Sequence, residues 1–120
     1  MQVKRTPADI VQAQVDAYNA RDFDAFASTY GDHAEIFRMP SGKSLVRDKA
    51  ELISFYTDAF NAEGLVEIVD RIVIGDNVVD HERLLVGNES HEALALYEIR
   101  EDCIQRVWLF EVLQEKIRPR

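Results

Sequence analysis

Apolar residues recur at helical spacing in three segments of the first half of the chain, and each segment follows a helix-start signal. The first begins after Thr6-Pro7-Ala8-Asp9, where Thr6 can cap the helix and Pro7 suits its first position. Gln14 is a polar position within the apolar face of this helix. A second, short helix follows Asp22, and a third follows the capping box Asp48-Lys49-Ala50-Glu51.

Alternating apolar and polar positions predict strands in the rest of the chain. Ala34 to Met39 is one candidate, and it ends at the turn Pro40-Ser41-Gly42. Four more candidates follow Gly64 and are separated by turns short enough for antiparallel hairpins: Val66 to Ile74, Val78 to Val86, Glu92 to Ile99 and Ile104 to Leu113. The resulting order, α-α-β-α-β-β-β-β, predicts an α+β fold in which helices cover one face of an antiparallel sheet.

Length and charge narrow the range of functions. The 120 residues suffice for one domain, so we expect a single domain over 1–120, with a frayed tail over 114–120. The 22 acidic and 14 basic side chains give a net charge of −8, which disfavours nucleic acids and anionic membranes as partners. No apolar run reaches the ~18 residues that a membrane-spanning helix needs, and the first residues lack the apolar segment of a signal peptide. We therefore expect a cytoplasmic location.

Neither a metal nor an organic cofactor is expected. Cys103 is the single cysteine, which excludes an intramolecular disulfide and any paired-cysteine zinc or redox motif. The histidines, His33, His81 and His91, lack the spacing of metal-binding motifs.

Four segments resemble the nuclear transport factor 2-like superfamily, whose members are also called SnoaL-like or ketosteroid-isomerase-like domains. They are residues Tyr18 to Phe26, Tyr30 to Ile36, Pro40 to Gly42 and Tyr97 to Ile104. The resemblance implies a cystatin-like cone, in which a strongly bent antiparallel sheet wraps around three helices and leaves a cavity. Members include isomerases, polyketide cyclases, dehydratases and hydrolases as well as association domains, and many are dimers. The resemblance therefore implies a fold, whereas the chemistry must be argued from the site.

The chain departs from the ketosteroid isomerase pattern at three positions. The resemblance would place a carboxylate base just before the Pro-x-Gly turn, where this chain has Arg38-Met39. A tyrosine on the first helix is replaced by Gln14, and a second acid on the penultimate strand by Ala95. Arginine stays protonated and methionine has no basic group, so we do not expect the standard isomerase mechanism.

The strand candidate Val78 to Val86 carries charged groups at its centre on both faces. In one interpretation a polar set faces a wet cavity, either His81 with Arg83 or Asp80 with Glu82; in the other this part of the sheet is exposed and carries cross-strand ion pairs. We favour His81 as a catalytic residue, because a neutral imidazole can exchange protons near neutral pH. Glu82 takes its place if the register differs by one residue.

Arg38 is the second catalytic candidate. It shares a face of its strand with Ile36, and the resemblance turns that face inward. An inward guanidinium could bind a carboxylate or stabilise an enolate-like oxygen. The alternative is a structural salt bridge to Glu35, Glu82 or Glu111.

Four further residues are candidates for ligand binding. Tyr97 alternates with the small residues Ala93 and Ala95, which would leave space for a hydroxyl donor. Tyr18, Gln14 and Glu111 are the others, although aromatic residues at such spacing are most often core.

These observations favour a small-molecule-binding cone domain. They leave open whether it catalyses a reaction; as an enzyme it would be a cofactor-independent acid/base enzyme of isomerase, cyclase or hydrolase type. Its ligand would be a small molecule with a carbonyl or carboxylate group. The alternative is a non-catalytic dimerisation or ligand-sensing module. If Val107 and Leu109 face the cone, Trp108 and Phe110 face outward and would form a homodimer contact.

Overall fold

The computed structural model describes residues 5–61 and 64–111, apart from the side chains of residues 58–60. Three helices and six strands follow one another along the chain: α1 (Pro7–Ala20), α2 (Phe23–Ser28), β1 (Tyr30–Met39), β2 (Lys43–Val46), α3 (Lys49–Asn61), β3 (Leu65–Ile74), β4 (Asn77–Val86), β5 (Glu89–Arg100) and β6 (Cys103–Glu111). The expected tail over 114–120, and the last two residues of the strand expected to end at Leu113, lie outside the described residues.

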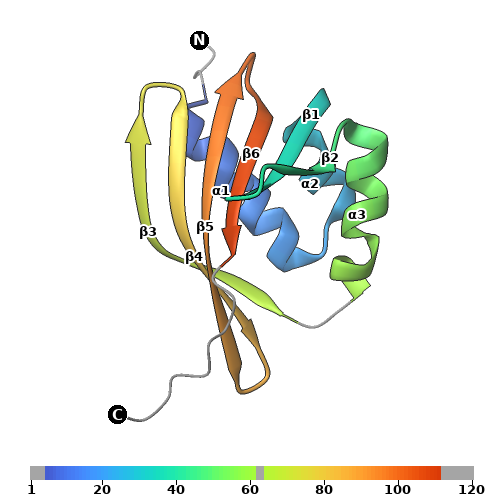
Figure 1. Cartoon of the computed structure of the whole chain (residues 1–120), viewed down its shortest axis with the longest axis vertical. Helices are drawn as coiled ribbons and strands as arrows, with labels where there is room; N and C mark the ends of the chain where they lie inside the picture. Colours follow the sequence, from blue (N-terminus) through green and yellow to red (C-terminus); the bar gives the residue numbers. More distant parts are fainter. Residues whose placement is uncertain (1–4, 62–63, 112–120) are drawn as a thin grey trace.

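The six strands form one curled sheet in the order β2-β1-β6-β5-β4-β3, with the helices on its inner side (Figure 1). This α+β cone confirms the expected fold class. Two details differ from the prediction. The short strand β2 pairs with β1 through Lys43 and Ser44, and its four residues are too few to show a clear alternating pattern. β1 also runs parallel to β6, so the sheet is mixed rather than purely antiparallel.

Local signals place the helices as the sequence predicts. The Thr6 hydroxyl accepts a hydrogen bond from the Asp9 backbone N–H at 3.1 Å, and the Asp9 carboxylate accepts one from the Thr6 backbone N–H at 3.0 Å. At the start of α3 the Asp48 carboxylate accepts a hydrogen bond from the Glu51 backbone N–H at 2.9 Å. Both arrangements satisfy backbone donors that a helix start leaves without partners.

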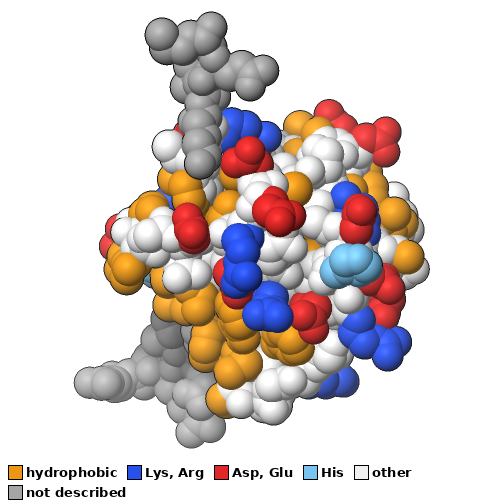
Figure 2. Space-filling model, turned by 90° about the horizontal axis from the view of Figure 1, so that it is seen from above, with side chains coloured by type: hydrophobic (Ala, Val, Ile, Leu, Met, Phe, Trp, Pro, Cys, Tyr) orange, Lys and Arg blue, Asp and Glu red, His pale blue; other side chains and the backbone are white. Residues whose placement is uncertain are grey.

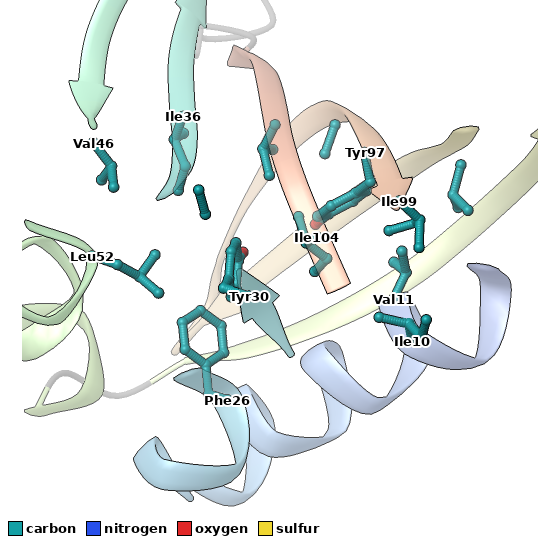
Figure 3. Packing of buried hydrophobic residues seen from close by; sticks show 14 of the residues in the cluster. Ile10, Val11, Phe26, Tyr30, Ile36, Val46, Leu52, Tyr97, Ile99 and Ile104 are labelled. Carbon is teal, nitrogen blue, oxygen red and sulfur yellow. The ribbon is translucent and has the colours of Figure 1, made fainter. Parts of the chain in front are cut away.

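The core lies between the helices and the inner face of the sheet (Figure 3). Phe26 of α2 packs against Tyr30 at the start of β1, with ring centroids 5.3 Å apart. Ile10 and Val11 contribute the apolar face of α1, and Ile104 contributes from β6. The hydroxyl groups of Tyr30 and Tyr97 lie within this otherwise apolar region (Figure 3), which places polar atoms inside the cone.

The end of α1 is bound to the start of β3 by polar contacts. The Asn19 side chain accepts a hydrogen bond from the Val66 backbone N–H at 2.8 Å and donates one to the Val66 carbonyl at 2.9 Å. Arg21, which adopts a left-handed backbone conformation, donates to the Gly64 carbonyl at 2.7 Å. These contacts fix where the outer part of the sheet begins relative to the helix that lies across it.

A bulge interrupts the pairing of β3 with β4. Ile68 lies opposite Glu82 and Asp70 lies opposite His81, so Val69 is an extra residue on β3. A bulge of this kind reverses which residues of the bulged strand face inward. Val66 and Ile68 face inward before it, and Arg71 faces inward after it.

Seen from above, acidic and basic side chains are interspersed over the molecule, and apolar side chains show at several places between them, with a larger group below the centre of the view (Figure 2). Within residues 5–61 and 64–111, no helix has both the length and the apolar character needed to cross a bilayer.

We predict that Asn19→Ala lowers the free energy of unfolding by about 2 kcal/mol, because it leaves the N–H and C=O of Val66 without these partners. Urea denaturation at equilibrium measures the effect. Asn88→Ala, at an exposed position in the turn between β4 and β5, is the matched control and should change stability by less than about 0.5 kcal/mol. Equal effects of the two substitutions would contradict the anchoring role of Asn19.

Candidate functional site

A cavity of about 600 Å³ opens between the helices and the inner face of the sheet. Its walls come from α1, α3 and all strands except β2, and most of the lining is apolar. This volume lies within the range of small-molecule sites, about 300–1,000 Å³. The cavity is therefore large enough for an organic ligand of one to three rings.

Glu82 of β4 is the carboxyl group placed most deeply in this cavity. Its side chain faces inward because residues of one parity on β4, from Val78 through Asp80 to Glu82, lie on the inner face. The Tyr97 hydroxyl donates a hydrogen bond to Glu82 Oε1 at 3.1 Å. Burial raises the pKa of Glu82 to about 7, although the Tyr97 hydrogen bond acts in the opposite direction. Glu82 can thus both release and accept a proton near neutral pH.

Tyrosine side chains surround Glu82. Tyr30 and Tyr97 are almost fully buried, and Tyr56 of α3 lies beside them in the cavity wall. Burial raises the pKa of all three phenols, and the charge of Glu82 raises them further. They therefore remain protonated at neutral pH and can act as hydrogen-bond donors.

Gln14 of α1 holds Tyr30 in place from the opposite wall. Its amide nitrogen donates a hydrogen bond to the Tyr30 hydroxyl oxygen at 3.3 Å, and the side chain is 6% exposed. Because the Tyr30 oxygen accepts this bond, its own proton points to another acceptor, and Tyr56 is its side-chain hydrogen-bond partner. Gln14 thus orients one hydroxyl of the tyrosine group.

The charges in the cavity wall are acidic. The lining drawn from the described residues contains Glu82, Glu92, Glu111 and His91, and neither lysine nor arginine. Glu92 is paired outside the cavity with His81 and Arg83, whose nitrogens lie 2.8 and 3.1 Å from its Oε1. An anionic ligand would find no cation in this wall and would lie close to carboxylates.

The structure does not place His81 in the cavity, contrary to our expectation. His81 faces the outer side of the sheet, where Nε2 lies 2.8 Å from Glu92 Oε1. The physical reason is the alternation of the strand, since an inward Glu82 requires an outward His81. Of the two inward pairs considered from the sequence, Asp80 with Glu82 is the one observed, and ion pairs occupy the outer face as well.

The expected position of Arg38 inside the cavity is also wrong. Its side chain is 45% exposed, and Nη2 lies 3.7 Å from Glu111 Oε2. Arg38 does share the inward parity of Ile36, but it lies near the end of β1, where this face reaches solvent. The salt bridge to Glu111, which was the alternative interpretation, is the arrangement observed.

All four ligand-binding candidates line the cavity, namely Tyr97, Tyr18, Gln14 and Glu111. The sequence did not single out Tyr30 and Tyr56 as site residues. Tyr56 lies at helical spacing with apolar neighbours and Tyr30 begins a strand, so both looked like ordinary core positions. Among residues 5–61 and 64–111, no cluster of three or more potential ligands could hold a metal ion.

A profile of the SnoaL-like domain family matches residues 11–107. Among curated proteins, none matches this sequence. The family match agrees with the resemblance of the local sequence segments to the nuclear transport factor 2-like superfamily.

Several solved structures share the fold. An uncharacterised cystatin-fold protein from Novosphingobium aromaticivorans is 24% identical, with a TM-score of 0.80 over 88% of this chain and 98% of its own. A candidate ketosteroid isomerase from Kribbella flavida is 14% identical, with a TM-score of 0.81 over 94% and 82% of the two chains. A candidate polyketide cyclase from Sinorhizobium meliloti is 19% identical, with a TM-score of 0.72 over 84% and 93%. At these identities the similarity shows the fold alone.

We predict that Glu82→Gln stabilises the protein above neutral pH but not at pH 5. A carboxyl with a pKa raised from 4.5 to about 7 on folding stabilises the fold below its unfolded pKa, and this contribution is lost as the pH rises through about 7. The variant should exceed the native protein in unfolding free energy by up to about 3 kcal/mol at pH 8. Urea denaturation from pH 5 to 8 measures the difference, and a pH-independent difference would contradict a buried, proton-exchanging Glu82.

Proposed function

Because the chain belongs to the SnoaL-like domain family, we propose that it is a cofactor-independent acid/base enzyme of isomerase or cyclase type. Its substrate is a small neutral carbonyl compound, and Glu82 transfers the proton. The observation that carries this proposal is the half-buried carboxyl group of Glu82 in a mostly apolar cavity, where the Tyr97 hydroxyl donates a hydrogen bond to it and desolvation raises its pKa to about 7. A general base works best when its pKa lies near the working pH.

The proposed reaction begins with Glu82 ionised. Its carboxylate removes a proton from the carbon next to the substrate carbonyl, and the electron pair of that C–H bond moves toward the carbonyl oxygen to give an enolate. Tyr56, whose raised pKa keeps it protonated at neutral pH, donates a hydrogen bond to that oxygen. In an isomerisation, the electron pair of the enolate extends over a conjugated C=C bond, and the protonated Glu82 returns its proton to the far carbon of that system. In a ring closure, the enolate carbon instead bonds to a second carbonyl carbon of the same molecule, and the protonated Glu82 gives its proton to the alkoxide oxygen that results.

The acidic lining restricts the class of substrate that the sequence suggested, which was a molecule with a carbonyl or a carboxylate group. A carboxylate ligand would need a cation in the cavity, and Arg38, the residue proposed to supply it, is paired with Glu111 and half exposed. Near pH 7 Glu82 carries a partial negative charge, which an apolar neutral ligand tolerates better than an anion does. We therefore favour a neutral carbonyl group over a carboxylate.

The alternative is a non-catalytic ligand-binding module with the same cavity. The two functions differ in what happens to a bound ketone: an enzyme exchanges the protons next to the carbonyl, whereas a binding module only holds the molecule. Proton exchange from a bound probe therefore separates them.

We predict that the protein accelerates the exchange of the carbon-bound protons of 2-tetralone, a neutral bicyclic ketone, in D2O. Proton NMR follows the loss of these signals. Glu82→Gln should reduce the rate at least 100-fold, and the native rate should rise with pH through about 7, since the ionised carboxylate is the base. Glu51→Gln is the control and should keep the native rate, because Glu51 of α3 forms an ion pair with Arg47 at the surface.

Equal rates for native protein and Glu82→Gln would contradict the role of Glu82. Binding of 2-tetralone without exchange, shown by shifts of the protein resonances, would favour the non-catalytic module.

We further propose that two copies of the chain associate through the outer face of the sheet. On this face an apolar row crosses five strands in register, and it consists of Ile72, Val79, Leu96, Trp108 and Phe37. The rings of Phe37 and Trp108 are stacked, with centroids 6.3 Å apart. Leu94 and Phe110 form a neighbouring pair and are 39% and 37% exposed. Contiguous apolar surface of this kind is typical of an interface between subunits.

We predict that the native protein is a dimer in sedimentation velocity and that Phe110→Glu makes it monomeric, because a charge placed in an apolar interface would be buried without a partner. Ile53→Glu is the matched control, since Ile53 is similarly exposed (46%) but lies on α3. The proposal is wrong if the native protein is a monomer, or if both variants remain dimers.

A further inference from the structure

A buried ion pair lies on the inner face of the sheet beside Glu82. Asp80 of β4 is 0% exposed. Its Oδ1 accepts a hydrogen bond from Arg71 Nε at 2.6 Å, and its Oδ2 accepts one from Arg71 Nη2 at 2.8 Å. Arg71 Nη1 also donates to the Gln12 side-chain oxygen of α1 at 2.9 Å. This two-point geometry, with both carboxylate oxygens occupied, is the arrangement that best maintains a buried carboxylate in its ionised form.

The bulge in β3 is what brings Arg71 to this position. Ile68 is paired with Glu82, so a regular strand would place Asp70 opposite Asp80. The extra residue, Val69, shifts the pairing by one and puts Arg71 opposite Asp80 instead. The bulge thus exchanges a repulsive pair of carboxylates for an ion pair.

Asp80 is close enough to Glu82 to affect it. The two residues are separated by one position on the same strand and face the same side, which puts their Cα atoms about 6.5–7 Å apart. At this spacing the charge of Asp80 raises the pKa of Glu82, because two like charges on one face of a strand oppose each other's ionisation. Arg71 offsets part of this repulsion, since its cation lies in the same region.

We propose that Asp80 is a positioning residue whose charge sets the pH at which Glu82 takes up and releases its proton, and that Arg71 keeps Asp80 ionised. In this arrangement Asp80 does not touch the ligand: the described cavity lining includes Glu82 but not Asp80. The importance of Asp80 for catalysis rests on the proposed function of Glu82. The effect of Asp80 on the titration of Glu82 is independent of that function.

Several other groups face Glu82 and set the background against which Asp80 acts. Burial is the largest influence on the pKa of Glu82 and raises it. The Tyr97 hydrogen bond comes next and lowers this pKa, the charge of Asp80 raises it, and the charge of Arg71 lowers it. The remaining titratable side chains in the cavity wall come from α1, β1, α3, β5 and β6, and they are Tyr18, Tyr30, Tyr56, His91, Glu92 and Glu111.

The test is the titration of the Glu82 side-chain carboxyl carbon by ¹³C NMR, with its signal assigned by comparison with Glu82→Gln. In Asp80→Asn, which keeps the shape of the side chain but removes the charge, the midpoint should fall by about one pH unit from its native position. Asp16→Asn is the matched control. Asp16 accepts a hydrogen bond from the same Gln12 that contacts Arg71, but it is exposed on α1, so its removal should leave the midpoint within about 0.2 pH units.

An unchanged midpoint in Asp80→Asn would overturn the inference, because a purely structural ion pair would alter stability without moving the titration of Glu82. If this variant does not fold, the double variant Asp80→Asn/Arg71→Gln removes both charges and leaves no buried cation without a partner. The Asp80 charge acts more strongly on the pKa of Glu82 than the Arg71 charge does, so the midpoint should still fall, and an unchanged or higher midpoint would overturn the inference. Failure of the proposed function is detected separately, by equal 2-tetralone exchange in native protein and Glu82→Gln.

Discussion

The alternation of side chains along β4 is the constraint on which the cavity depends. Neighbouring residues of a strand point to opposite faces, so a single choice of parity sends Asp80 and Glu82 inward and His81 and Arg83 outward. The inward pair supplies an acid and its charged neighbour, whereas the outward pair binds Glu92 on the other face. The distribution of polar chemistry between the inside of the cone and its outer surface follows from that one parity.

Two inward carboxyl groups on one strand meet different environments, and this difference separates their roles. Asp80 receives a guanidinium on both oxygens and is kept charged, whereas Glu82 receives one tyrosine hydroxyl and faces apolar walls. Burial disfavours a charge that is not matched by an opposite charge. A group whose ionisation is costly in the folded state is available to exchange protons, so the stability lost at Glu82 and its proposed chemistry have the same physical origin.

Local sequence signals were enough to predict the α+β class and most of the elements, and the family resemblance implied the cone, but neither was sufficient for the site. The capping residues Thr6 and Asp48 and the alternating strands depend on neighbours a few positions away, and such signals are visible in one chain. The parity of β4 could not be read because charged residues occupy both of its faces, which led to the choice of His81 over Glu82. The bulge at Val69 arises from the pairing of β3 with another strand, which one sequence does not show. Asp70 and Arg71 are neighbours in the sequence, and nothing local indicated which of them would face Asp80. The sequence wrongly predicted Arg38 inside the cavity, because the residue has the inward parity but lies near the end of β1, where that face reaches solvent.

The irregular pairing of β3 also affects how the protein behaves among other copies of itself. β3 is an edge of the sheet, and an edge strand with free backbone groups can recruit a strand from another chain and begin aggregation. Ile72, Val73 and Ile74 make the far end of this edge apolar and exposed. The extra residue at Val69 bends the strand and the charges of Glu67 and Asp70 flank it, so a second chain cannot continue a regular ladder along its full length. The bulge that supplies Asp80 with its cation should therefore also hinder amyloid-like growth from this edge.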